Sequence, residues 1–212
     1  MKLSLKNPEH LHIPENSGNT FKGCDQEWFG SLWQRKAGCG PSVATNVLLY
    51  LHGTGTVTLP EDVHCKTECI RLMETLWRHV TPTAMGVHTL DLFCNGVKDF
   101  ALSQGTLLQC RTLGIPQKGT LRPALSAVVG FIQKAFESGC PVAFLNLSNG
   151  KVRNLDKWHW VTVVGLETGE DDGGVQARIY DAGKAFTIDL KLWHETTTLG
   201  GGFVYFEKSG QS

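Results

Sequence analysis

The stretch "QRKAGCGPSVATNVLLYL" (34–51) places Cys39 between two glycines and directly ahead of a proline and a run of apolar residues. Proline suits the first turn of a helix, because a backbone N–H has no partner within the helix there. From Ala44 to Leu51 the apolar residues recur at i, i+3, i+4 and i+7, and Gly53 ends the pattern. The stretch therefore predicts an amphipathic helix that begins at or just after Cys39.

Length and charge limit the classes of function. At 212 residues the chain is long enough for a full core, and we expect one domain over 1–212, in which residues 1–30 form either an N-terminal arm or a pro-segment. The 20 basic residues balance the 20 acidic residues, so neither nucleic acid nor an anionic membrane is expected as a partner. A peptide or another small substrate fits this composition better.

The seven cysteines form an odd set without the spacing of a disulfide framework. The chain also has no apolar run long enough for a membrane span, and its first residues lack the apolar core of a secretory signal. We therefore expect a cytoplasmic protein with reduced thiols, in which Cys94 and Cys110 are core residues. His64, Cys65 and Cys69 lack a fourth ligand nearby, so no metal site is expected.

The periodicity of the apolar residues changes near the middle of the chain. Three segments have helical spacing, at 60–80, 88–103 and 121–138. Five later segments are short, rich in branched and aromatic residues, and separated by Gly, Asn and Asp: 141–147, 158–165, 175–181, 185–190 and 202–207. Helices followed by strands predict an α+β fold, with an N-terminal helical part packed on a mainly antiparallel sheet.

Cys39 is a candidate nucleophile because of its position at a helix start. The N–H groups and the positive end of the helix dipole favour a thiolate over a thiol there. Gly38 and Gly40 carry no side chain that could block a substrate carbonyl, so Gly38 is a candidate substrate-binding residue. The alternative is a small buried cysteine that only packs at the helix start.

A thiolate nucleophile also needs a base and donors for the oxyanion. His159 opens the segment "WHWVTVVG", Asp181 closes the next strand, and Gln34 lies five residues before Cys39. Adjacent antiparallel strands can bring the carboxylate against the imidazole, and the Gln34 amide can supply an oxyanion donor. Each of the three residues also has a simpler interpretation, as a core histidine, a turn residue and a surface polar residue.

Tryptophans lie close to both halves of this candidate site. Trp33 precedes Cys39 in the chain, and Trp158 directly precedes His159. Aromatic side chains often line ligand clefts, so both are candidate substrate-binding residues. Ordinary core packing is the alternative for each.

Together, Gln34, "GCGPSVA" (38–44), "WHWVTVVG" (158–165) and "YDAG" (180–183) resemble the papain-like cysteine peptidase superfamily. They are most similar to its bacterial branch related to the double-glycine leader peptidases, here without a transporter. The resemblance implies a papain-like cysteine proteinase fold, with Cys39 as nucleophile, His159 as general base and acid, Asp181 as the residue that orients the imidazole, and Gln34 as oxyanion donor.

These residues predict a cysteine peptidase or a related thiol-dependent amide hydrolase that acts on a peptide or protein without a metal or cofactor. An acyl transferase of the transglutaminase type uses the same triad and is the second hypothesis, since the acyl-enzyme is common to both. A peptide-binding module without activity is the third. The sequence does not indicate an oligomeric state.

Overall fold

The computed structural model describes residues 1–15, 18–169 and 173–210. Within these ranges seven strands form one antiparallel sheet in the order β4-β9-β5-β6-β7-β8, and β1 also pairs with β6. The strands are β1 (Lys2–Ser4), β4 (Leu108–Ile115), β5 (Val142–Asn146), β6 (His159–Thr168), β7 (Val175–Asp181), β8 (Lys184–Asp189) and β9 (Gly201–Lys208). A separate hairpin joins β2 (His12–Pro14) to β3 (Thr20–Lys22).

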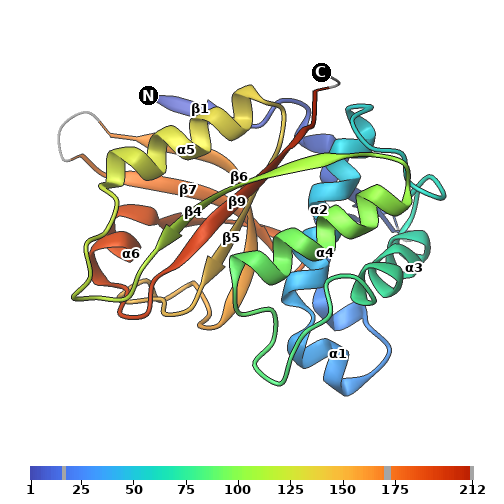
Figure 1. The fold of residues 1–212 in the computed structure, drawn as a ribbon, viewed down its shortest axis with the longest axis horizontal. Helices are drawn as coiled ribbons and strands as arrows, with labels where there is room; N and C mark the ends of the chain where they lie inside the picture. The colour runs from blue at the N-terminus through green and yellow to red at the C-terminus, as the bar shows by residue number, and fades with distance from the viewer. Residues whose placement is uncertain (16–17, 170–172, 211–212) are drawn as a thin grey trace.

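Most of the helices gather beside this sheet (Figure 1). The α-helices are α1 (Leu32–Ala37), α2 (Cys39–Gly53), α3 (Lys66–Trp77), α4 (Leu90–Ser103), α5 (Leu125–Glu137) and α6 (Leu190–Thr196), and two short 3-10 helices are η1 (Pro8–Leu11) and η2 (Gln26–Trp28). Helices α1 to α4 form one half of the molecule and the sheet forms the other, while α5 lies along the sheet (Figure 1). The predicted α+β class is therefore confirmed.

Helix α2 is the central element of the helical half. Its residues from Cys39 to Leu51 are all buried, because the helix packs against β5 and β6 on one side and against α3 and η1 on the other. This burial corrects the expectation of a single apolar face. It also requires internal partners for the polar side chains: the Asn46 side chain accepts a hydrogen bond from the Cys24 N–H at 2.8 Å and donates one to Thr162 Oγ1 at 2.9 Å.

Strand β6 lies in the middle of the sheet and holds the histidine at its first residue. Its first half pairs with β5 and its second half with β1, while β7 runs along its other edge. Trp160 is fully buried, stacks on Phe93 with 4.3 Å between ring centroids, and donates a hydrogen bond to the Val87 carbonyl at 2.6 Å. These contacts fix the start of β6, and therefore His159, against the helical half.

Two of the differences between the predicted and the observed elements concern α3 and β4. The helix expected at 60–80 begins only at Lys66, where Cys65 is the N-cap and the Glu68 side chain accepts hydrogen bonds from the His64 and Cys65 N–H groups. Strand β4 was not predicted. The residues between its buried ends alternate irregularly between exposed and half-buried, since among the described strands β4 is an edge strand paired with β9.

Cys94 of α4 and Cys110 of β4 form a disulfide, which corrects the expectation of reduced core thiols. The two residues are only 16 positions apart, but a helix and a turn bring them together, and the sequence spacing does not reveal this pairing. The disulfide also removes one of the grounds for expecting a cytoplasmic protein, the reduced thiols. None of the helices in the described ranges is long and apolar enough to cross a bilayer.

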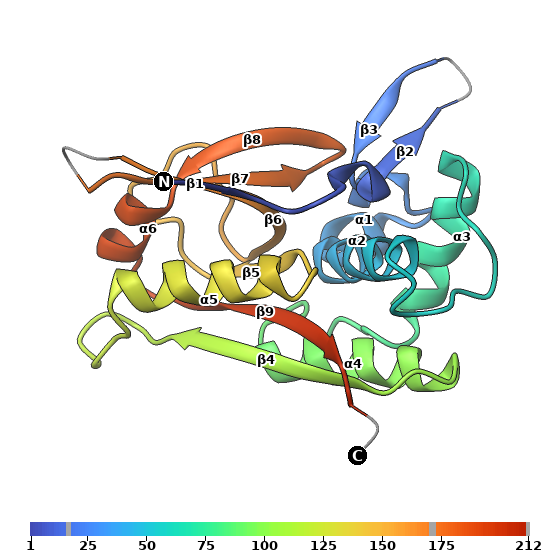
Figure 2. The same ribbon diagram turned by 90° about the horizontal axis from the view of Figure 1, so that it is seen from above.

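Residues 1–30, which we expected to form an arm or a pro-segment, contribute several elements of the fold. Strand β1 extends the large sheet beside β6, and Leu5, Leu11 and Phe29 are buried in the core. The β2–β3 hairpin projects from the body of the molecule (Figure 2). The chain then returns through η2 to the start of α1, close to Cys39.

Candidate active site

His159 and Asp181 lie at the same end of two paired strands. His159 is the first residue of β6, Asp181 is the last residue of β7, and the strands are antiparallel. His159 Nε2 lies 2.8 Å from Asp181 Oδ1, so the carboxylate holds the imidazole by its Nε2. The other ring nitrogen, Nδ1, is left for a second partner. The side chains are 13% and 24% exposed, which shields their interaction from water.

The surroundings of His159 favour its protonated form. Burial by itself lowers the pKa of the imidazole, but the hydrogen bond to Asp181, a hydrogen bond with the Cys39 side chain and the charges of both partners outweigh it and raise the pKa to about 10. An imidazolium that persists well above neutral pH can stabilise a neighbouring thiolate.

Cys39 is the first residue of α2, and it lines a small buried cavity together with His159 and Asp181. The cysteine is only 9% exposed, yet it also lies at the edge of two larger surface cavities. The structure therefore brings Cys39, His159 and Asp181 together around one cavity.

A tight turn holds Asp181 in place. Ala182 and Gly183 form the two-residue connection between β7 and β8, with φ of 47° and 69°. The Gly183 carbonyl accepts a hydrogen bond from the Lys22 N–H at 2.8 Å. The turn that carries Asp181 is thus held both by its own hairpin and by the last residue of β3.

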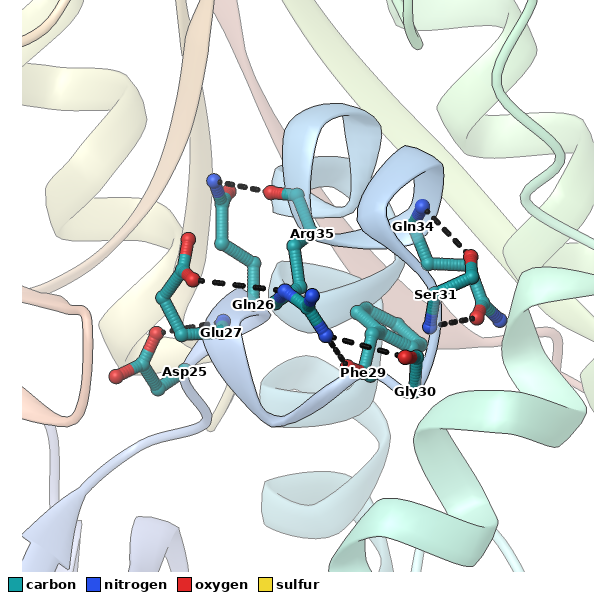
Figure 3. Close-up of polar contacts among 8 residues, drawn as sticks. All are labelled: Asp25, Gln26, Glu27, Phe29, Gly30, Ser31, Gln34 and Arg35. Atoms are coloured by element: carbon teal, nitrogen blue, oxygen red, sulfur yellow. Dashed lines mark hydrogen bonds and ion pairs between the residues drawn. The ribbon is translucent and has the colours of Figure 1, made fainter.

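Gln34 does not face the cavity that Cys39 and His159 share, which corrects its predicted role. Its side-chain oxygen accepts a hydrogen bond from the Ser31 N–H at 3.1 Å, and its Nε2 donates to Glu74 Oε2 at 2.5 Å. The bond to Ser31 belongs to a capping box at the start of α1 (Figure 3). The Gln34 side chain therefore caps α1 through Ser31 and contacts α3 through Glu74.

Gln26 is the glutamine that lies beside Cys39. It lines both the buried cavity and one of the open cavities that include Cys39 and His159. Its Nε2 donates to the Arg35 carbonyl at 2.8 Å (Figure 3), which leaves the second N–H of the amide for another acceptor. Gln26 precedes Cys39 by 13 positions, and η2 and α1 lie between them. The sequence alone therefore does not show that the two residues are close together.

The two glycines beside Cys39 are required by packing. A Cβ atom on Gly38 would lie 2.6 Å from the Phe29 ring and 2.4 Å from the Gln34 carbonyl, and one on Gly40 would lie 2.8 Å from Val87. Gly38 also stands at the junction of α1 and α2. The absent side chain of Gly38 therefore makes room for the core, and its predicted contact with a substrate stays a prediction.

Trp33 and Trp158 line the same cavity as Cys39, as we expected of substrate-binding residues. This apolar pocket has a volume of about 330 Å³, and its apolar walls are Trp33, Met85, Val87, Leu145, Leu147 and Trp158. The two tryptophans are 49% and 47% exposed. Trp158 also has a φ of 53°, an uncommon value for a bulky residue, which points to a functional constraint.

A second open cavity of about 540 Å³ borders Cys39 and has a different character. Its charged side chains are Lys36, Arg153, Lys157 and Asp156, and we call it the basic groove. His159 lines the basic groove, whereas it is not part of the apolar pocket. Trp158 and Lys36 border both cavities, so they mark the division between them.

The three residues considered above for a metal have other partners. His64 lies 4.0 Å from Asp62, Cys65 caps α3, and the Cys69 sulfur contacts the Cys24 sulfur at 3.2 Å. Across the described part of the chain, no group of three or more histidine, cysteine or acidic side chains converges as a metal site.

The crystal structure of UfSP from C. elegans resembles this chain, with a TM-score of 0.55 and 11% sequence identity. The alignment covers 97% of this chain and 36% of UfSP, so the chain spans about a third of that protein's length. UfSP has a papain-like fold, and the likeness shows that this chain has that fold too. No protein-family model and no curated protein matches the sequence, so the similarity to the leader peptidase branch stays a prediction.

Proposed function

We propose that this chain is a thiol hydrolase that cleaves amide bonds in peptides or proteins. The observation that carries the proposal is the His159 imidazole, which lies between the carboxylate of Asp181 and the side chain of Cys39. Papain-like folds accommodate peptide substrates, and the two open cavities beside Cys39 leave room for one on both sides of a reacting carbonyl.

In the proposed mechanism the Cys39 thiolate attacks the carbonyl carbon and forms a C–S bond. The carbonyl oxygen becomes an oxyanion, and the C–N bond breaks as protonated His159 transfers its proton to the leaving nitrogen. Neutral His159 then accepts a proton from water, whose oxygen attacks the thioester. The acid product leaves and the Cys39 thiolate reforms beside imidazolium.

The oxyanion needs two donors close to the reacting carbonyl. We assign them to the backbone N–H of Cys39, at the first residue of α2, and to the second N–H of the Gln26 amide. Because Gln26 lines the open cavity with Cys39 and His159, its amide is in reach of a bound carbonyl. Asp181 keeps the imidazole oriented and stabilises its charge.

Cysteine alkylation tests the reactivity that this mechanism requires. Iodoacetamide modification of each free cysteine is measured by peptide mapping at pH 6, well below the usual thiol pKa of about 8.5. Cys65 is half-buried and therefore more accessible than Cys39, so it serves as the internal control. We expect Cys39 to react faster than Cys65, and to lose this advantage in His159→Ala.

A chloromethyl ketone peptide provides the second measurement. Stoichiometric labelling of Cys39, followed by turnover of peptide substrates in the unlabelled protein, supports a hydrolase. Labelling with transfer of the acyl group to amines in preference to water identifies an acyl transferase. A folded protein whose Cys39 reacts no faster than Cys65 and binds peptides without turnover is a binding module, and the proposal is then wrong.

A further inference from the structure

We infer that the basic groove binds a carboxylate carried by the leaving half of the substrate, and that Arg153 and Lys157 recognise it. This inference rests on the proposed function, because it assigns a direction to the bound peptide. The carboxylate belongs either to an acidic side chain or to a free C-terminus, and the two sources are separated in the test below.

The direction follows from the position of the proton donor. His159 must deliver its proton to the leaving nitrogen, so the leaving half of the substrate lies on the side of His159. Of the two open cavities at Cys39, the basic groove includes His159 and the apolar pocket does not. The acyl half therefore occupies the apolar pocket and the leaving half occupies the basic groove.

The charge of the groove is unusual for this chain. Its lining contains Lys36, Arg153 and Lys157 but only one exposed carboxylate, Asp156, although the whole sequence is neutral. Within the described residues, none of these three cations makes an ion pair or a side-chain hydrogen bond, so their charges are free to meet a ligand. Three cations around one cavity without partners fit an anionic ligand.

The loop that carries two of these cations is held firmly. It connects β5 to β6, and its buried residues Val152 and Leu155 anchor it to the core. The Asn154 side chain donates to the Thr187 carbonyl at 2.9 Å, and the Asn146 side chain donates to the Asp156 carbonyl. Because the backbone is fixed, Arg153 and Lys157 can meet a ligand without a large cost in loop ordering.

Aminolysis of the acyl-enzyme measures recognition on the leaving side alone. The enzyme is acylated with the thiobenzyl ester of a blocked apolar dipeptide, and an added dipeptide amine competes with water for the thioester. The amine nitrogen attacks the carbonyl carbon, the C–S bond breaks, and the amine proton passes to His159. The ratio of aminolysis to hydrolysis then reports how well the acceptor binds.

Three acceptors separate the sources of the carboxylate: Ala-Glu amide, Ala-Gln amide and Ala-Gln with a free C-terminus. We expect the ratio of aminolysis to hydrolysis to be higher for Ala-Glu amide, for Ala-Gln with a free C-terminus, or for both, than for Ala-Gln amide. The increase should be about two- to fivefold for each cation that the carboxylate contacts, and it should shrink at high salt. The variant Arg153→Gln/Lys157→Gln should lose it. Lys151→Gln is the matched control, because Lys151 is an exposed cation of the same loop outside the groove lining. Equal use of all three acceptors, or an advantage that survives Arg153→Gln/Lys157→Gln, overturns the inference.

A binding measurement keeps the two proposals separate. If no acyl-enzyme forms, the proposed function fails, and the groove is then tested in Cys39→Ala with fluorescent hexapeptides that differ only in Glu against Gln. Tighter binding of the Glu peptide that Arg153→Gln/Lys157→Gln abolishes supports a carboxylate site. Equal binding of the two peptides rejects a side-chain carboxylate, and equal binding of the Gln peptide and its C-terminal amide rejects a C-terminal one; the two results together reject the site.

Discussion

The Nε2 atom of His159 lies 2.8 Å from Oδ1 of Asp181, although the two residues are 22 positions apart in the chain. They meet because β6 begins where β7 ends. The carboxylate takes one ring nitrogen, so the other remains for the sulfur of Cys39. The negative charge of Asp181 therefore lies beside the imidazole of His159, and the first prediction depends on this contact.

Asp181→Asn should lower the pKa of His159 from about 10 toward the usual 6.5, because the variant loses a negative partner while burial still disfavours the imidazolium. In the wild type, activity should persist through neutral pH and fall as the pH rises through about 10, where His159 loses the proton that the leaving group needs. In Asp181→Asn this alkaline limb should move to lower pH and kcat should fall. A pH profile of kcat/KM checks both, and an unmoved limb would show that Asp181 does not control the imidazole.

The same pair makes stability depend on pH. The folded pKa of His159 lies above its unfolded value, so its contribution to the free energy of unfolding is complete below about 6.5 and is lost as pH rises through about 10. Urea denaturation from pH 6 to pH 10 should show a decrease in the wild type that is smaller in Asp181→Asn. Equal decreases in the free energy of unfolding of the two proteins would contradict the assignment of this pH dependence to the His159–Asp181 pair.

Gln26→Ala and Gln34→Ala should have different effects. Loss of an oxyanion donor typically costs about 10²–10³-fold in kcat, and we expect this for Gln26→Ala. Gln34→Ala should leave kcat within about twofold and lower stability by at most about 1 kcal/mol, because its amide caps α1. Steady-state kinetics and thermal melts of both variants check the assignment, which a large kcat effect confined to Gln34→Ala would reverse.

Replacement of Trp158 should separate stability from function. The residue has a φ of 53°, where an L-residue other than Asn or Asp is strained by about 1 kcal/mol, so Trp158→Gly and Trp158→Asn should raise the melting temperature. Both variants remove a wall of the apolar pocket, so KM for substrates with a bulky apolar acyl side should increase. A lower melting temperature in both variants would show that the ring stabilises the fold more than the backbone strain costs.

Removal of the disulfide should destabilise the protein without touching the site. Cys94 and Cys110 close a short loop of 16 residues, for which chain entropy gives about 3 kcal/mol of stability. Cys94→Ala/Cys110→Ala should therefore unfold at lower urea concentration than the oxidised wild type. Reduction of the wild type should reproduce the shift and leave the variant unchanged; a wild type that reduction does not affect would contradict a stabilising bond.

Local patterns in the sequence determined a large part of this fold. The branched and aromatic residues between Gly and Asp turns predicted strand β7 at its observed bounds, and the proline after Cys39 predicted the start of α2. These features depend on neighbours within a few positions, because helix and strand periodicities record which side of each element faces the core. The short motifs also singled out Cys39, His159 and Asp181, which lie around one cavity, since each stands at the end of an element that the sequence delimits.

Tertiary structure decided the rest, because it depends on where distant segments meet. Gln34 stands nearer to Cys39 in the chain, but a capping box turns its amide to α3, while η2 brings Gln26 to the site. The Cys94–Cys110 bond exists because α4 and β4 pack together. Likewise, the apolar pocket and the basic groove each combine residues from α1 with residues that follow β5. The sequence alone does not show which residues line each cavity, because these segments meet only in the folded chain.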